Sequence, residues 1–129
     1  MGNGDYKLKL VHDGDGLWAT VTGTRSVANT AAYWEAILAE VLRQRPRWLY
    51  VDDRMKGAEI AIGEWFALVD AMKGRGLEGL RIAHVKPVGV NHLEYCEIFA
   101  REAGLEARAF SDPGTAERWL RYGVPEETR

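Results

Sequence analysis

The stretch that decides the fold is Arg47-Trp48-Leu49-Tyr50-Val51-Asp52-Asp53. It follows the helix-stopping pair Arg45-Pro46, and its apolar run predicts a β-strand that ends in paired acids where a polar loop begins. On each side of it lies a segment whose apolar residues recur with helical spacing. A strand between two such helices is typical of β-α-β units, so the sequence predicts an α/β protein.

Two strands are expected before this stretch. Tyr6, Leu8 and Leu10 alternate with lysines, which is the period-two pattern of a half-buried strand. The segment 17–23 alternates in the same way, and the two Asp-Gly pairs within residues 13–16 predict a hairpin between the two runs. We therefore expect the first two strands to be antiparallel neighbours.

The remaining elements follow from apolar spacing, caps and breakers. They are a helix that begins at Ser26 or Asn29 and ends before Pro46, a helix over 62–72, a strand over 80–86, a helix over 93–103, a strand over 105–110 and a helix opened by Asp112-Pro113. Right-handed crossovers would make strands two to five parallel. Because the first strands alternate instead of being apolar throughout, we expect a five-stranded mixed sheet with four helices mainly on one face and the other face open.

Length and composition narrow the class of protein. The chain has 129 residues, which favours a single domain with a core over about 6–121. The net charge is −2 and no basic stripe occurs, so a nucleic-acid-binding function is disfavoured. One cysteine fits a reducing compartment, and no apolar run reaches the length of a membrane span. These features predict a cytoplasmic protein without integral membrane association.

Several stretches resemble the STAS domain of the SpoIIAA-like superfamily, in its STAS/SEC14-like branch. They are residues 17–23 before the first helix, residues 48–52 as the central strand, and Phe110-Ser111-Asp112 followed by residues 116–120 in the last helix. The resemblance spans roughly residues 6–121. It implies a mixed sheet wound with helices as a β-α superhelix, which agrees with a sheet covered mainly on one face.

The best-known members of that superfamily are anti-sigma-factor antagonists, which are switched by phosphorylation of a Ser at the start of the helix after the central strand. Here that segment, residues 55–64, contains neither Ser nor Thr, so the resemblance does not carry the phosphorylation switch over. We expect a non-enzymatic STAS-like interaction or regulatory domain, which binds a protein partner or itself as a homodimer. The alternative is a binding or carrier domain for a small apolar or lipid-like molecule. An enzyme that uses polar groups at the strand ends is a third class.

Polar residues gather where the predicted parallel strands end, and ligands of open α/β sheets bind at that edge. The candidates for a small polar or anionic ligand are Thr24, Arg25, Asp52, Asp53, Arg54, Lys86, Asn91 and His92. A solvated turn would have a similar composition, so both interpretations stay open.

Other patterns argue against catalytic and metal chemistry. The set of Asp52, His84 and His92 matches no spacing of a known metal motif, and we predict neither a metal nor a cofactor. Cys96 shares an apolar helical face with Phe99, which indicates a core thiol and not a nucleophile. The chain has no nucleophile elbow and no phosphate-binding glycine loop, so we expect no enzymatic activity.

Aromatic residues collect on the strand side that faces away from the predicted helices. Trp18, Trp48 and Tyr50 share this side by alternation. Exposed aromatic clusters tend to mark contact surfaces, which would make these residues the interface of a homodimer. A loop or the N-terminal segment folded over them would explain the same pattern.

Overall fold

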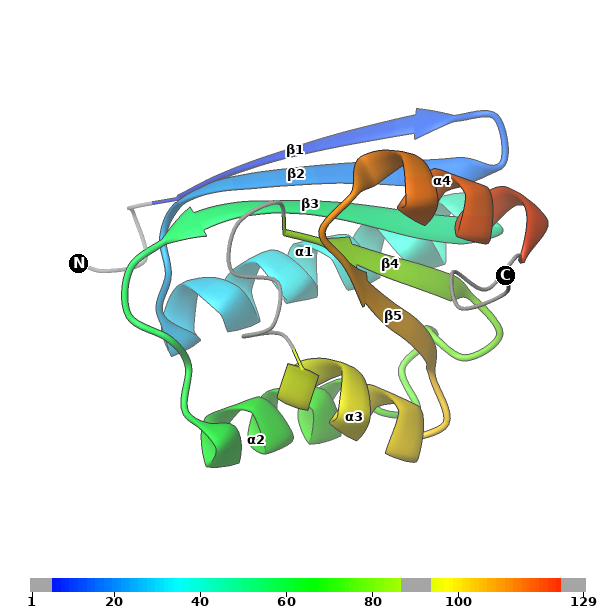
Figure 1. The fold of residues 1–129 in the computed structure, drawn as a ribbon. Helices are drawn as coiled ribbons and strands as arrows, with labels where there is room; N and C mark the ends of the chain where they lie inside the picture. The colour runs from blue at the N-terminus through cyan, green and yellow to red at the C-terminus, as the bar shows by residue number, and fades with distance from the viewer. Residues whose placement is uncertain (1–5, 87–93, 124–129) are drawn as a thin grey trace.

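The computed structural model describes residues 6–86 and 94–123. The elements follow one another as β-β-α-β-α-β-α-β-α, as predicted (Figure 1). They are β1 (Tyr6–Asp13), β2 (Gly16–Thr24), α1 (Val27–Gln44), β3 (Trp48–Lys56), α2 (Ile62–Met72), β4 (Arg81–Val85), α3 (Glu94–Glu102), β5 (Glu106–Phe110) and α4 (Pro113–Tyr122).

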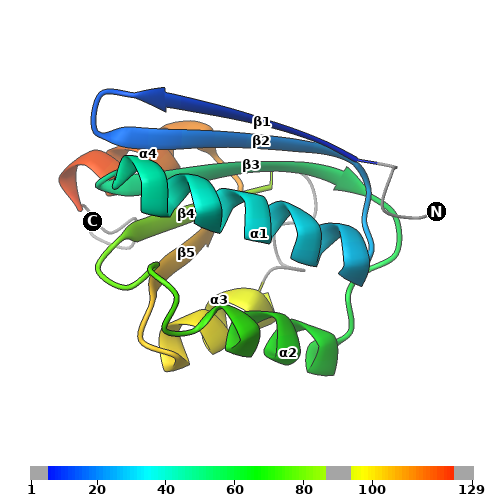
Figure 2. The same ribbon diagram turned by 180° about the vertical axis from the view of Figure 1, so that it is seen from behind.

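The five strands form one mixed sheet in the order β1-β2-β3-β4-β5. The hairpin strands β1 and β2 are antiparallel, and the pairs from β2 to β5 are parallel, which confirms the predicted sheet. Because each crossover leads to the adjacent strand with the same hand, α1, α2 and α3 lie on one side of the sheet. The last helix, α4, lies on the opposite side from α1 in both views (Figures 1 and 2).

The helix ends are set by local side-chain chemistry. Ser26 caps α1 by accepting a hydrogen bond from the Asn29 amide at 3.0 Å, which decides between the two predicted starting residues. At the other end Arg45 takes a left-handed conformation with φ of 53°, and Pro46 follows it. Asp112 caps α4 through the Thr115 amide at 2.8 Å, with Pro113 in the first turn as predicted.

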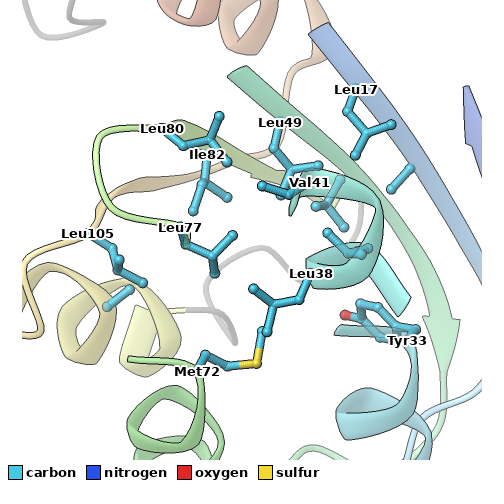
Figure 3. Packing of buried hydrophobic residues seen from close by; sticks show 14 of the residues in the cluster. Leu17, Tyr33, Leu38, Val41, Leu49, Met72, Leu77, Leu80, Ile82 and Leu105 are labelled. Carbon is cyan, nitrogen blue, oxygen red and sulfur yellow. The ribbon is translucent and has the colours of Figure 1, made fainter. Parts of the chain in front are cut away.

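The main core lies between the sheet and the first three helices. Figure 3 shows Leu17 and Leu49 of the sheet above Leu38 and Val41 of α1, with Met72 of α2 pointing toward α1. Inward-facing residues of β2, β3 and β4 supply one layer, as the period-two alternation of strands requires. Its fully buried members include Leu17, Ala19, Val21, Ile37, Leu49 and Val51.

The prediction that one face of the sheet is open is wrong, because α4 covers much of that face. Trp48 and Tyr50 are only 5% and 6% exposed, and they pack with Trp119 of α4 in a second core. The apolar stripe of α4 needs a surface to bury, and the first three helices already occupy the other face. Two of the three predicted interface residues are therefore inside the fold, and Trp18 is half-buried beside them.

The apolar stripe of α2 is narrower than the sequence predicts. Ile62 and Phe66 recur at helical spacing with Trp65, Val69 and Met72, which predicts that they face the core, yet they are 50% and 55% exposed. The reason is that α2 packs against α3 and α1 and not flat on the sheet, so it buries only Trp65, Val69 and Met72. Within residues 6–86 and 94–123, no helix combines the length and hydrophobicity that crossing a bilayer requires.

Candidate functional site

The paired acids Asp52 and Asp53 lie within β3 and not in a loop after it, which corrects the predicted end of that strand. Neighbouring residues of a strand point to opposite faces. Asp52 accordingly lies on the α4 side, where its carboxylate pairs with Arg54 Nε at 3.0 Å. Asp53 lies on the side of α1 and is 4% exposed. The two acids therefore belong to different environments.

Asp53 is the centre of a buried charge cluster. Its Oδ2 lies 2.8 Å from His84 Nε2 of β4, and its Oδ1 accepts a hydrogen bond from the Met55 amide at 3.0 Å. The Lys86 ammonium lies 4.0 Å from the same Oδ1. Like Asp53, the side chains of His84 and Lys86 are more than nine-tenths buried. A carboxylate so deeply buried requires such partners.

The cluster shifts the acidity of its members. Burial disfavours the Asp53 carboxylate, but the hydrogen bond and charge of His84, the Met55 amide and the Lys86 ammonium outweigh it, so the pKa of Asp53 lies below its usual value. Burial lowers the pKa of Lys86, and the nearby Asp53 offsets part of that change. Burial, and then the charge of Asp53, raises the pKa of Tyr33 well above its usual value.

Arg25 links the ends of β2 and β3 to this cluster. Its guanidinium donates to the carbonyl of Met55 at 2.7 Å and to that of Gly57 at 2.8 Å. Lys86 Nζ donates to the same Met55 carbonyl at 3.1 Å. Arg25 and Lys86 thus both donate hydrogen bonds to backbone carbonyl oxygens. The cluster ties the carboxyl ends of three parallel strands together.

The eight predicted ligand-binding residues fall into three groups. Arg25, Asp53 and Lys86 meet in the charge cluster, as their position at one sheet edge predicts. Asp52 and Arg54 pair with each other on the α4 side, and Thr24 is exposed at the end of β2. Asn91 and His92 lie outside the described residues.

His84 is the member of the cluster that sequence reasoning missed as a partner of Asp53. It was considered only with Asp52 and His92 as a metal ligand, and Asp52 lies on the other face. Strand alternation could have indicated this pairing. His84 lies on the same side of β4 as Ile82, and Asp53 lies on the same side of β3 as Val51. Among residues 6–86 and 94–123 there is no group of three or more His, Cys, Asp or Glu side chains that could hold a metal ion.

An apolar pocket lies beside this cluster, between the first three helices and the sheet. Its cavity volume is about 90 Å³, and the atoms that line it are almost all carbon. Leu77, Ile82 and Leu105 form part of its wall, and Figure 3 shows these three side chains near Met72 of α2. His84 belongs to both the charge cluster and the pocket, since it is also one of the lining residues. The pocket lies where α2 packs on α3, and α3 in turn packs on β5.

A few of the residues that line the pocket carry polar groups. Glu35 lies at the rim and makes a bidentate pair with Arg75, with both N–O distances 2.8 Å. Trp65 is 5% exposed and lines the pocket, and no described residue accepts a hydrogen bond from its indole Nε1. Buried donors are nearly always paired in proteins, so an indole N–H without a partner among the described residues is unusual.

Cys96 also lines the pocket, half-buried on α3. Burial, and then the charges of Asp53 and Glu97, raises the pKa of its thiol to about 12. The thiolate is the reactive form, so the thiol is expected to be inert at neutral pH. These properties fit the predicted structural role of Cys96.

We expect Cys96 to react with an aromatic disulfide reagent at pH 7.5 at least ~100-fold more slowly than in the denatured chain, because so little thiolate forms. It is the only cysteine of the chain, so the absorbance of the released thiol reports on it alone. Equal rates in native and denatured protein would contradict a buried thiol.

The fold and the site together define an α/β protein with an apolar pocket beside a buried ion cluster. Comparison of the chain with protein-family models and with curated proteins finds no match.

Proposed function

We propose that this protein is a non-enzymatic binding domain that holds a small apolar molecule in the pocket between α1, α2, α3 and the sheet. The observation that carries the proposal is the almost complete carbon lining of a pocket that five different elements build. Ligand pockets are typically apolar concavities with a few placed polar groups, and this pocket has both.

The charge cluster supports an apolar ligand, because its charged groups are already paired with protein atoms. Arg25, Asp53 and Lys86 already contact protein atoms, so little of their hydrogen-bonding capacity is left for an anionic ligand. Cys96 is held as a thiol, which disfavours a nucleophilic role. The cluster is better suited to holding the strand ends together, which fixes the position of His84 in the pocket wall.

The test is a pair of substitutions of alanine by leucine. Ala100 lines the pocket from α3, and a leucine there would fill much of the cavity. Ala67 is exposed on α2 and does not line the pocket, so its replacement is the matched control. We expect xenon, which is smaller than benzene and suits a cavity of about 90 Å³, to bind wild type and Ala67→Leu in an NMR titration, and to bind Ala100→Leu at least tenfold more weakly. Failure of xenon and of short alkanes to bind folded wild type would contradict the proposal.

A second proposal is a STAS-like interaction domain, in line with the family resemblance. The support is the sequential strand order with three crossover helices on one side, which is what a β-α superhelix requires. Ile62 and Phe66 add an exposed apolar pair, one turn apart on the helix after the central strand. A homodimer or a protein partner would bind there and not through the buried Trp48 and Tyr50.

Native mass spectrometry of the purified protein separates the two proposals. A protomer that carries an additional small mass supports the carrier, and a bare dimer supports the interaction domain. A bare monomer in native conditions, with no probe bound in the NMR titration, would count against both.

A further inference from the structure

We propose that two copies of this chain pair through the outer edge of β1, so that their sheets join across a two-fold axis. The two β1 strands run antiparallel, with Leu10 opposite the partner's Leu10. This inference goes beyond the proposed binding function and does not depend on the pocket. It also leaves the exposed Ile62 and Phe66 of α2 available to another partner.

β1 is an edge strand with one unpaired side. The sheet order begins with β1, and among residues 6–86 and 94–123 only β2 pairs with it. Both ribbon views show β1 at the margin of the sheet, with no helix or strand beyond it (Figures 1 and 2). It has eight residues, whereas the other edge strand, β5, has five. A long exposed edge is a template for pairing with another chain.

The opposite edge of the sheet is partly protected. The Phe110 carbonyl of β5 accepts a hydrogen bond from the Lys86 amide at 2.9 Å, so the neighbouring Ala109 points its backbone groups away from β4. The Ala109 amide donates to the Glu97 carboxylate of α3 at 3.2 Å, which occupies a donor at that edge. In the part of the chain that the structure describes, no side chain bonds to the backbone of β1 in this way.

The alternation of backbone groups shows which residues face the free edge of β1. The Asp15 carbonyl accepts from the Arg47 amide at 2.7 Å, and the Arg25 amide donates to the Lys56 carbonyl at 2.7 Å. Odd-numbered residues of β2 therefore point to β3, and even-numbered residues point to β1, where their register partners are odd-numbered. The residues whose backbone groups face outward are thus Tyr6, Leu8, Leu10 and His12.

Charges exclude most registers of two antiparallel β1 strands. Outward-facing residues must lie opposite one another, so the possible registers differ by two residues. With Leu8 opposite the partner's Leu8, Lys7 lies opposite the partner's Lys9. With Leu8 opposite the partner's Leu10, Lys9 lies opposite the partner's Lys9. Like charges directly opposite one another destabilise a strand pair.

The register centred on Leu10 avoids this repulsion. Lys7 then lies opposite the partner's Asp13, and the two-fold axis repeats this ion pair. Lys9 lies opposite the partner's Val11, whose side chain is 42% exposed in the single chain and can pack against the lysine stem. This register pairs residues 7–13, whereas a further shift pairs only residues 9–13 and forms fewer hydrogen bonds. Charge and length therefore favour the same arrangement.

The side of β1 that faces α1 adds apolar contact. Tyr6, Leu8 and Leu10 are partly buried against the main core, and the rest of their surface lies at the sheet edge. In the favoured register Leu10 meets the partner's Leu10 on the axis, so the two cores approach each other there. One strand pair is smaller than a standard interface, and we therefore expect a weak dimer with a Kd on the order of 100 µM.

The experiment is sedimentation equilibrium of the full chain, with circular dichroism to confirm that each variant is folded. Lys7→Asp and Asp13→Lys each place like charges opposite one another at two symmetric positions, and each should raise the dimer Kd roughly tenfold. The double variant restores opposite charges, so its Kd should return to within about threefold of the wild-type value.

Two further variants are matched controls. Lys9→Asp makes the same change of charge as Lys7→Asp, but opposite the partner's Val11, and should change the Kd less than about threefold. Phe66→Ser removes the exposed ring of α2 and should leave the dimer unchanged.

Amide hydrogen exchange of wild type tests the contact without any substitution. The amides of Leu8, Leu10 and His12 should gain protection as the dimer fraction rises, because they donate across the axis. The Tyr6 amide also faces outward but lies beyond the paired stretch, so it should gain none.

Several results would overturn the inference. Wild type that stays monomeric up to about 1 mM would do so, while xenon binding would still decide the pocket by itself. Protection of the three amides in the monomer would show that another part of the chain covers this edge. A dimer that ignores the charges of Lys7 and Asp13, or that Phe66→Ser abolishes, would place the contact elsewhere. A dimer that Lys9→Asp strengthens would show a register with lysines opposite one another.

Discussion

Replacement of Trp48 by Lys is expected to unfold the protein or to lower its melting temperature by roughly 10–20 °C. The indole is 5% exposed, meets Trp18 edge-on at 5.2 Å between ring centroids, and lies under α4. Loss of a buried aromatic ring costs about 3–5 kcal/mol, and a lysine would add a charge beside Arg121, whose guanidinium lies 5.3 Å from the ring centroid. Total stabilities of about 5–15 kcal/mol make this a large fraction.

Trp18→Lys is the matched control, because Trp18 lies on the same face and is only half-buried. We expect it to lower the melting temperature by less than half as much. Circular dichroism measures both variants, and light scattering after size exclusion reports their mass. A Trp48→Lys variant that melts like wild type but has lost a dimer would show that the aromatic side of the sheet is a contact surface and that α4 does not cover it in solution.

Asp53→Ala is expected to destabilise the fold by about 3–5 kcal/mol, because it leaves buried partners without their counter-charge. Lys86 and His84 have side chains that are 8% and 7% exposed, and both contact the Asp53 carboxylate. Adding Lys86→Met to Asp53→Ala should recover part of the loss by removing the unpaired ammonium. Urea unfolding of the single and double variants measures these differences.

The preceding residue provides the control. Asp52→Ala breaks a pair with Arg54 whose guanidinium side chain is 60% exposed, and such pairs are worth at most about 1 kcal/mol. We therefore expect nearly wild-type stability from it. Similar losses for both aspartates would mean that Asp53 is not a buried counter-charge.

The same carboxylate sets a dependence on pH. Because the pKa of Asp53 is lowered in the fold, its contribution to stability is present above about pH 4, the range of unfolded aspartate, and is lost as the pH falls through the folded pKa. Wild type should therefore lose stability in acid more steeply than Asp53→Asn, which has no such group. Parallel acid titrations of the two proteins, followed by circular dichroism, check this expectation.

The sequence by itself determined the order of elements and the sheet. Apolar alternation in residues 6–10 and 17–23 predicted the hairpin, and helical spacing around the central strand predicted the crossovers. These patterns are local, since they follow from the periods of strand and helix. The caps Ser26 and Asp112 act within one turn, so they were also predictable.

Only the tertiary structure decided which surface each element covers. Helical spacing puts Ala116, Trp119 and Leu120 on one face of α4, and that face is buried, yet nothing local says that this helix packs on the side opposite α1. Because α4 packs there, Trp48 and Tyr50 are buried and this face of the sheet is not open. The exposure of Phe66 has the same origin, since it depends on where α2 stands relative to the sheet.

In the candidate site, too, some features were predictable from the sequence and others were decided only by the tertiary structure. The convergence of Arg25, Asp53 and Lys86 followed from parallel strands ending at one edge, which the sequence predicts. The pairing of Asp53 with His84 required the register between β3 and β4, because register fixes which side chains lie adjacent across a sheet. The pocket wall formed by Trp65, Cys96 and His84 joins residues from three elements, and long-range packing alone brings such residues together.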